Sequence, residues 1–319
     1  MHRSLMRILA ACFALAIGLH AQGAPVSYTG MCDASAAVLL DSDRFVVAND
    51  EDNLLRTYSL SRPGAPLASL DVGAFLGADK EADIEGAART GNRIWWVTSH
   101  GANKNGKPRP DRHRLFATDV QDGAGGVALT PYSAGHRTLD ALFSGSIGKR
   151  YGLEQAARQA PESPGGLNIE GLAAAPSGGL LIGLRSPVPG GRALIVPLAN
   201  ADAYLASNGG NAVAPVFGEA ILLDLGKRGI RSIELVPGTR DYLIVAGPPG
   251  PAKSGTFALF GWRIGKPPVQ LKTDWPPDFR PEALMVDGAG KKIHVLSDDG
   301  DDCGKPPAFR LLSTPLPVW

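Results

Sequence analysis

The sequence predicts an all-β fold, a β-propeller with five blades, six being the alternative. A short phrase recurs five times, and each copy leads into an apolar, strand-like run and then into a second one. Strands joined by turns rich in Gly, Asp or Asn and repeated along a whole chain are typical of propeller blades. The composition agrees, because 40 Gly and 26 Pro suit many short strands with tight turns. The copies of the phrase begin at Asp33, Asp83, Asn168, Ile230 and Arg280.

These copies divide the chain into blades in sequence order. Residues 25–28 are expected to add an outer strand to the last blade, because few residues remain after Phe309. The stretch 138–160 contains no copy of the phrase and has a helical pattern, so we expect a short helical excursion there. The predicted blades span residues 33–77, 83–135, 168–226, 230–274 and 280–319.

The first 23 residues have the pattern of a signal peptide. Arg3 and Arg7 precede an apolar stretch, and small residues around Ala21 follow it. The stretch is too short and wrongly flanked for a stable transmembrane anchor, although an uncleaved anchor is the alternative. We therefore expect a periplasmic or secreted protein, a monomer with no stable membrane insertion, whose residues 24–319 form a single propeller domain.

The two cysteines outside the signal peptide support export. Cys32 precedes the first copy of the phrase and Cys303 lies in the last one. First and last blades are neighbours in a closed propeller, so we expect a disulfide across the seam, with two free thiols as the alternative. The formal net charge of +1 offers no basic surplus, and nucleic acid is not an expected partner.

One aligned column suggests a metal site. If the copies are aligned on their following turn, the first positions of the inner strands should meet on the channel axis. Converging carboxylates repel one another unless something neutralises them, and a ring of Ser and Glu offers only oxygen ligands, as calcium prefers. The alternative is that these Glu side chains cap inner strands or bind channel water. The predicted ligands of Ca²⁺ are Ser35, Glu85, Glu170, Ser232 and Glu282.

The turns that follow the second strands should surround the same mouth of the channel. They bring candidate catalytic groups, Asp50, His100 and Asp298, and candidate groups for binding an anionic substrate, Lys104, Arg112, Arg114 and Arg185. Basic side chains beside a calcium ion suit a phosphoester or phosphoanhydride, because both neutralise charge that develops during transfer. A solvated loop with scattered charge is the alternative for the basic turn.

Two family resemblances follow from particular phrases. LNIEGLA, LLIGLRSP, YLIVAGPPG and FALFGWR resemble an uncharacterised bacterial family, the domain of unknown function numbered 3616. The run GIRSIELVPGTRDYLIVA, which begins at Gly229, is similar to a stretch of the calcium-activated nucleotidases (apyrases). That resemblance implies a five-bladed propeller with an axial calcium held by Ser, Glu, Glu, Ser and Glu, the order of the column above.

Three functions are consistent with these patterns. The first is a calcium-dependent hydrolase of phosphoesters or phosphoanhydrides that acts on an anionic small molecule. The second is a non-catalytic propeller that binds a ligand or protein and whose calcium is structural. The third is a lactonase-like or esterase-like propeller enzyme. Fold class does not choose among them, because propellers host all three.

Overall fold

The computed structural model describes residues 23–123, 126–207, 212–300 and 303–319. Nearly all of the predicted signal peptide, residues 1–22, lies outside the described residues. Within the described ranges, no helix is long and apolar enough to cross a membrane.

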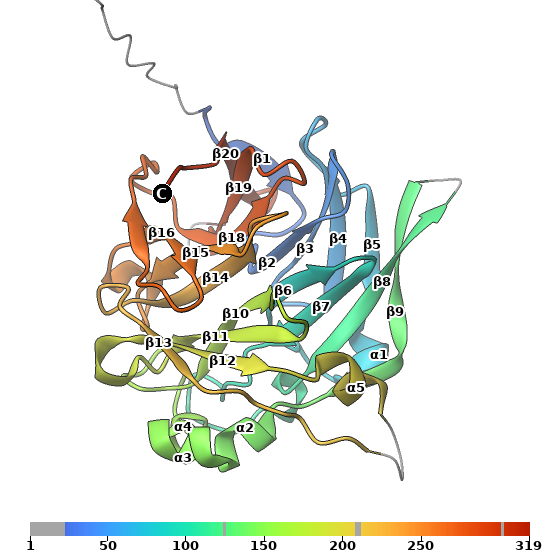
Figure 1. The fold of residues 1–319 in the computed structure, drawn as a ribbon. Helices are drawn as coiled ribbons and strands as arrows, with labels where there is room; N and C mark the ends of the chain where they lie inside the picture. The colour runs from blue at the N-terminus through green and yellow to red at the C-terminus, as the bar shows by residue number, and fades with distance from the viewer. Residues whose placement is uncertain (1–22, 124–125, 208–211, 301–302) are drawn as a thin grey trace, which may run out of the picture.

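The chain folds into five four-stranded antiparallel sheets arranged around a central channel (Figure 1), which confirms the five-bladed propeller. The innermost strand of each blade contacts that of the next, and β18 of the last blade contacts β2 of the first, so the ring is closed. In order from the channel outward, blade one contains β2 (Ala36–Leu39), β3 (Arg44–Ala48), β4 (Leu54–Ser59) and β5 (Ala68–Asp71). Blade two contains β6 (Ile84–Thr90), β7 (Arg93–Thr98), β8 (Leu115–Gly123) and β9 (Gly126–Arg137).

The remaining blades repeat this arrangement. Blade three contains β10 (Asn168–Ala174), β11 (Leu180–Ser186), β12 (Ala193–Leu198) and β13 (Ile221–Leu223). Blade four contains β14 (Gly229–Leu235), β15 (Asp241–Gly247), β16 (Ala258–Arg263) and β17 (Val269–Leu271). Blade five contains β18 (Pro281–Val286), β19 (Lys292–Ser297) and β20 (Ala308–Pro315), with β1 (Val26–Thr29) as its outer strand.

The two ends of the chain meet in blade five, as the sequence predicts. Strand β1 pairs antiparallel with β20, with Tyr28 opposite Phe309. Tyr28 is fully buried among Phe45, Tyr58 and Phe309, with ring centroids 5.2 to 5.5 Å apart. This aromatic cluster joins blades one and five, and it stabilises the seam through large buried apolar surfaces.

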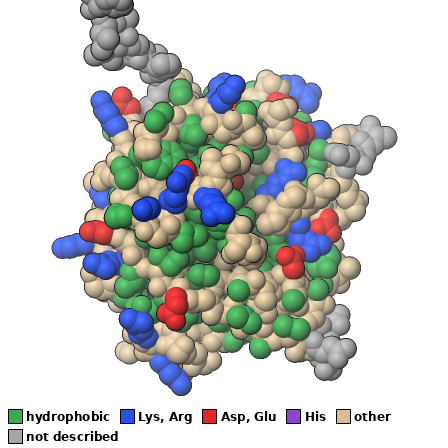
Figure 2. Space-filling view, viewed as in Figure 1, with side chains coloured by type: hydrophobic (Ala, Val, Ile, Leu, Met, Phe, Trp, Pro, Cys, Tyr) green, Lys and Arg blue, Asp and Glu red, His purple; other side chains and the backbone are tan. Residues whose placement is uncertain are grey.

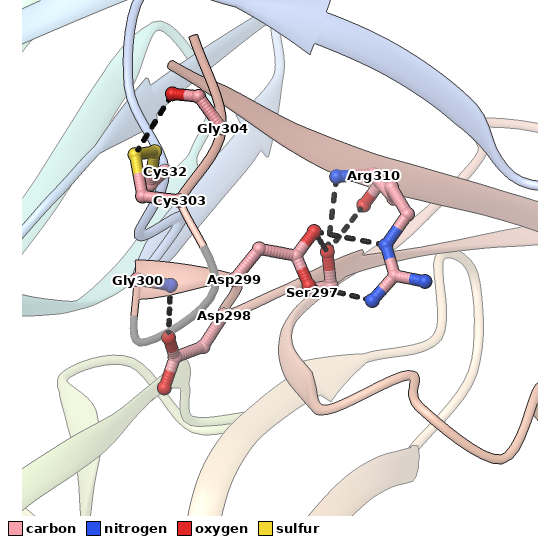
Figure 3. Close-up of a disulfide and its surroundings, with 8 residues drawn as sticks. All are labelled: Cys32, Ser297, Asp298, Asp299, Gly300, Cys303, Gly304 and Arg310. Carbon is pink, nitrogen blue, oxygen red and sulfur yellow. Dashed lines mark hydrogen bonds and ion pairs between the residues drawn. A yellow bond between two sulfur atoms is a disulfide. The ribbon is translucent and has the colours of Figure 1, made fainter.

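A disulfide between Cys32 and Cys303 crosses the same seam (Figure 3), which confirms the predicted pairing. Beside it, Arg310 binds the carboxylate of Asp299 through Nε and Nη2, at 2.9 and 2.6 Å. The neighbouring Asp298 carboxylate points away from this pair and accepts the backbone N–H of Gly300 at 3.1 Å. Asp299 therefore fixes the loop, whereas Asp298 is left to face the channel.

The connection between blades two and three contains the expected excursion, built from three short helices. They are α2 (Asp140–Ser144), α3 (Ser146–Tyr151) and α4 (Leu153–Ala156). Leu142, Phe143 and Leu153 are buried against blades two and three. The other helical segments are α1 (Gly73–Leu76), α5 (Ala201–Ala206), and the 3₁₀ turns η1 (Pro110–Arg112), η2 (Pro189–Gly191) and η4 (Ala252–Ser254).

Candidate functional site

The mouth of the channel where the inner strands begin contains a small cavity, here called the ring cavity. Its volume is about 110 Å³, enough for an ion with a few waters but small for an organic substrate. Almost all of its lining side chains are charged or polar. They are Asp33, Ser35, Asp50, Glu85, Glu162, Glu170, Arg185, Arg231, Ala252, Glu282 and Asp298.

A recurrent β-bulge places the side chains of this ring. The pairing of the inner strand with its neighbour shifts between Ile84 and Gly86, so Glu85 is the extra residue that turns toward the axis. The same shift occurs around Glu170 in β10. In blade five the shift covers Glu282 in β18. Bulges often re-aim a side chain near functional sites.

In blade four the bulged residue is Arg231, not the predicted Ser232. Ser232 pairs with Val245 on the regular ladder, and its Oγ accepts the backbone N–H of Leu284 at 3.2 Å. It does not line the ring cavity. In this copy the ring position is therefore occupied by Arg231, one residue before the predicted Ser232, because the stretch from the bulge to the following turn at Gly238 is one residue longer.

Arg231 neutralises part of the ring. It is 2% exposed, and its Nε donates to Oε2 of Glu282 at 2.8 Å, with a second bond from Nη2. The same Nε lies 3.2 Å from Oε2 of Glu170. Arg185 adds a bond from Nη1 to Oε1 of Glu170 at 2.9 Å. Two guanidinium groups thus stand against Glu170 and Glu282.

Glu85 belongs to two groups of three carboxylates. One oxygen from each of Glu85, Glu170 and Glu282 lies within 4.8 Å of the others, and the same holds for Asp50, Asp83 and Glu85. Glu85 is 7% exposed, and no hydrogen bond or ion pair of its carboxylate occurs among the described residues. Oδ1 of Asp50 is likewise buried without a hydrogen-bond partner there. Such unpartnered buried oxygens are costly, and they mark a place where a cation would be stabilised.

Asp83 completes the second group from a strained backbone position. Its φ of 62° lies in the left-handed region, which is uncommon outside glycine. Arg112 Nη1 contacts its Oδ2 at 2.9 Å, and the hydroxyl of Ser99 donates to the same oxygen. The sequence analysis did not select Asp83 as a ligand, although it opens the second copy of the phrase.

The electrostatics of the ring follow from burial and crowded carboxylates. Burial, together with the charges of Glu170 and Asp83, raises the pKa of Glu85 well above its usual range. Burial raises the pKa of Asp50 to about 7, with a further contribution from Asp83 and Asp298. Burial and neighbouring Glu170 outweigh the charge of Arg231, so the pKa of Glu282 is also raised. Ionising these crowded carboxyl groups together is therefore unfavourable, and a bound cation would offset that cost.

Asp33 and Asp298 form a proton-sharing pair between blades one and five. Burial and a hydrogen bond with Asp298 raise the pKa of Asp33 to about 9. Burial acts against ionisation of Asp298, but the bond from Asp33 and the charge of Arg231 lower the pKa of Asp298 overall. The pair carries one proton and one negative charge at neutral pH. Asp33 is a second lining residue that the sequence analysis did not select.

His100, a predicted catalytic residue, lies away from the ring cavity and makes structural hydrogen bonds. It is 0% exposed and lies outside the cavity lining. Its Nδ1 donates to the carbonyl of Thr98 at 2.9 Å, and its Nε2 accepts the backbone N–H of Leu139 at 3.0 Å. Burial and the nearby His113 lower the pKa of His100 to about 3, so the ring is neutral. His100 attaches the helical excursion to blade two.

The predicted anion-binding side chains divide into two groups. Arg112 and Arg185 lie at the mouth, but they are engaged with Asp83, Glu81 and Glu170. Arg185 also donates to the carbonyls of Pro248 and Gly250, in the loop whose Ala252 lines the cavity.

Lys104 and Arg114 do not reach the cavity. Lys104 is exposed on its loop. Arg114 donates from Nε to the carbonyl of Leu76 at 3.0 Å and from Nη1 to that of Pro110 at 2.6 Å. Figure 2 shows Lys and Arg side chains at several separate places on the face viewed, rather than in one basic patch.

The fold and an oxygen-rich channel mouth define an all-β propeller with a candidate cation site. The chain belongs to the family described as "Protein of unknown function (DUF3616)", whose model matches residues 33–120 and 151–272. This confirms the resemblance stated from the sequence phrases. Among curated proteins, no significant match was found.

Similar solved structures share only the architecture. The luciferin-regenerating enzyme has a TM-score of 0.43 at 7% identity, covering 91% of this chain and 95% of that chain. The β-propeller domain of Myceliophteria thermophila Cps50 (Swd1) has a TM-score of 0.40 at 9% identity, covering 92% and 100%. The WD40 repeats of RRP9 have a TM-score of 0.44 at 10% identity, covering 92% and 99%.

Proposed function

We propose that this chain is an exported calcium-binding propeller whose cation is held off the channel axis by Asp50, Asp83 and Glu85. The hydroxyl of Ser35, which lines the same cavity, would complete the protein ligands. The observation that carries the proposal is Glu85, a buried carboxylate that has no partner among the described residues and belongs to both carboxylate groups.

The distribution of charge favours this position over the axis. Arg185 and Arg231 balance Glu170 and Glu282, so an axial cation would lie beside a guanidinium group. Repulsion between Arg231 and a divalent ion would oppose binding there.

The negative charge that the arginine side chains do not balance matches the charge of a divalent cation. Arg112 balances Asp83, and the pair Asp33 and Asp298 carries a single negative charge that faces Arg231. Asp50 and Glu85 remain uncompensated. Hard oxygen ligands in a small cavity suit calcium, which accepts carboxylates, hydroxyls and water together.

A calcium ion at this position would stabilise the fold. Asp50 follows β3 of blade one, whereas Asp83 and Glu85 begin blade two. An ion that they share would link the two blades, and binding to the folded state alone raises stability by mass action. Export is supported by the disulfide, which forms and persists in oxidising compartments, and by the pattern of the first 23 residues.

A second candidate function is the calcium-dependent hydrolysis of phosphoesters or phosphoanhydrides. Asp50 favours it, because a carboxylate with a pKa of about 7 and a free oxygen suits a general base. Asp50 would take a proton from a water molecule as that water attacks phosphorus, and the P–O bond to the leaving alcohol or phosphate would break. The loop held by Arg185 through the carbonyls of Pro248 and Gly250 would have to move to admit such a substrate. A lactonase-like or esterase-like activity would require the same movement of this loop.

The test is the melting temperature of protein stripped with EGTA and then titrated with calcium or magnesium. We expect a saturable rise of several degrees with calcium, which Glu85→Gln removes. The matched control is Glu219→Gln, an exposed carboxylate outside the ring cavity. No calcium response in the wild type, or an undiminished response in Glu85→Gln, contradicts the proposed site.

The hydrolase candidate has a separate test. We expect release of p-nitrophenol from bis(p-nitrophenyl) phosphate to require calcium and to fall at least 100-fold in Asp50→Asn. Calcium stabilisation without turnover leaves the binding propeller as the function and eliminates the hydrolase.

A further inference from the structure

The opposite mouth of the channel contains a second and larger cavity, here called the distal cavity. Its volume is about 1050 Å³, at the upper end of the range for small-molecule sites. It lies where the inner strands end, so it is separated from the ring cavity by the length of those strands. All five inner strands contribute to its lining, through Leu39, Arg89, Ala174, Leu235 and Val286.

Most of the charged groups of the distal cavity are engaged by their own turns. Asp41 accepts the backbone N–H groups of residues 43 and 44 and binds the Arg44 side chain at 2.7 Å. Asp43 accepts the hydroxyl of Ser59 at 2.8 Å, and Asp287 accepts the backbone N–H of residue 291 at 2.7 Å. These carboxylates hold the turns of their own blades.

The basic groups are similarly placed. Arg89 donates to the carbonyls of residues 39, 40 and 91, which fixes it across the ends of two blades. His294 is 6% exposed and bonds through Nδ1 to the hydroxyl of Ser313 at 2.8 Å. Lys292 is exposed at the start of β19.

Glu234 differs from all of these. It is a partly buried residue of β14 that lines the distal cavity, and within the described part of the chain its carboxylate has no hydrogen bond or ion pair. Apolar side chains, among them Val38, Leu235 and Val286, form much of the surrounding wall. A lone carboxylate on an apolar wall is stabilised by a ligand that brings its own positive charge.

We propose that the distal cavity binds a small organic ammonium ligand, with the Glu234 carboxylate as its counterion and the apolar wall contacting the ligand's hydrocarbon part. The volume admits a drug-sized molecule. The unpartnered carboxyl group of Glu234 favours a cation over an anion.

Binding is coupled to a proton. Burial raises the pKa of Glu234 to about 8, so the free protein carries a neutral carboxyl at pH 6.5. When the ammonium enters, Glu234 releases its proton to solvent and the ligand keeps its own. Burial lowers the pKa of His294, which disfavours a competing cation at this position. Affinity therefore falls as the pH is lowered from 8 toward 6.

Titration calorimetry with 2-phenylethylamine as the probe tests the proposal, with 2-phenylethanol as the uncharged analogue. At pH 6.5 we expect the amine to bind at least tenfold more tightly than the alcohol. The measured heat of binding should differ between phosphate and Tris buffers, because the buffer takes up the proton that Glu234 releases. Glu234→Gln should remove the preference for the amine. Glu219→Gln, an exposed carboxylate outside the distal cavity, should leave it unchanged.

The calcium response distinguishes this proposal from the proposed function, because Glu234→Gln should keep the calcium-dependent rise in melting temperature. If the amine does not bind, or binds equally to the wild type and to Glu234→Gln, the proposal is overturned. Equal binding of amine and alcohol also overturns it, because the cavity would then recognise only apolar surface.

Discussion

Replacing Arg231 by serine tests whether the chain's own guanidinium takes the place of an axial cation. Arg231→Ser removes the partner of Glu282, whose Oε2 lies 2.8 Å from Nε, and of Glu170 at 3.2 Å. Removing one member of a buried ion pair costs about 3–5 kcal/mol, because the remaining carboxylates are left uncompensated. Without a metal ion, we therefore expect the free energy of unfolding to fall by this amount.

Calcium should restore much of this loss in Arg231→Ser. The substitution gives the ring Ser35, Glu85, Glu170, Glu282 and a new hydroxyl, all oxygen ligands around the axis. A ligand at 100 times its dissociation constant stabilises the folded state by about 2.7 kcal/mol. Urea unfolding followed by the fluorescence of the five tryptophans, in EGTA and in calcium, measures both effects.

The control for Arg231→Ser is Arg263→Ser, which breaks an ion pair with Asp241 on the surface. We expect little change there, because exposed pairs are screened by solvent. If Arg231→Ser unfolds at the same urea concentration as the wild type in EGTA, the ring is not held by this guanidinium. If calcium stabilises Arg231→Ser and the wild type equally, removing the Arg231 guanidinium does not make the axial position available to calcium.

Three further predictions concern other parts of the fold. Cys303→Ser should lower the free energy of unfolding by about 3–5 kcal/mol under oxidising conditions, measured by urea unfolding, and an equal stability in reductant and oxidant would show that the seam does not depend on the disulfide. His100→Ala should speed proteolysis within residues 138–160 and leave the calcium-dependent rise in melting temperature intact. Loss of that rise would show that His100 contributes to the calcium site. Glu234 binds a proton more tightly in the folded state, because its pKa is raised to about 8. The free energy of unfolding should therefore fall by about 1–2 kcal/mol between pH 6 and pH 8.5, and it should change less in Glu234→Gln. Identical pH profiles of the two proteins would contradict the burial of this carboxyl group.

The sequence predicts the architecture well because the repeated phrase reports directly on periodic strands. Five copies give five blades, and the seam follows from the positions of Cys32 and Cys303. Local hydrophobic pattern and turn residues are sufficient for this, since each blade is built from antiparallel neighbours in the chain.

The site is predicted less completely, because its geometry depends on features that hydrophobic pattern does not contain. A bulge interrupts the inner strands of blades two to five, and in blade four the bulged residue is Arg231, one residue before the predicted Ser232. The buried pairing of Arg112 with Asp83 depends on loop conformation. His100 looked catalytic from its place after β7, but the helical excursion covers it and occupies its Nε2.

A signal for the position of Arg231 was present in the sequence. The residue after the bulge is Gly86 in β6 and Gly171 in β10, and a Cβ at either would approach a neighbouring atom to 2.7 Å. In the other two bulged strands the equivalent residues are Ser232 and Ala283, which are also small. The residue directly before each of these small residues faces the ring cavity. An alignment on these small residues places Arg231 beside Glu85, Glu170 and Glu282.

The most direct test of the calcium site is the anomalous scattering of a crystal of the EGTA-treated protein soaked in calcium, measured at long wavelength. The off-axis arrangement predicts one strong peak within about 2.3–2.6 Å of oxygens from Asp50, Asp83 and Glu85. A peak on the channel axis among Glu85, Glu170 and Glu282, or no peak in the ring cavity, would contradict it.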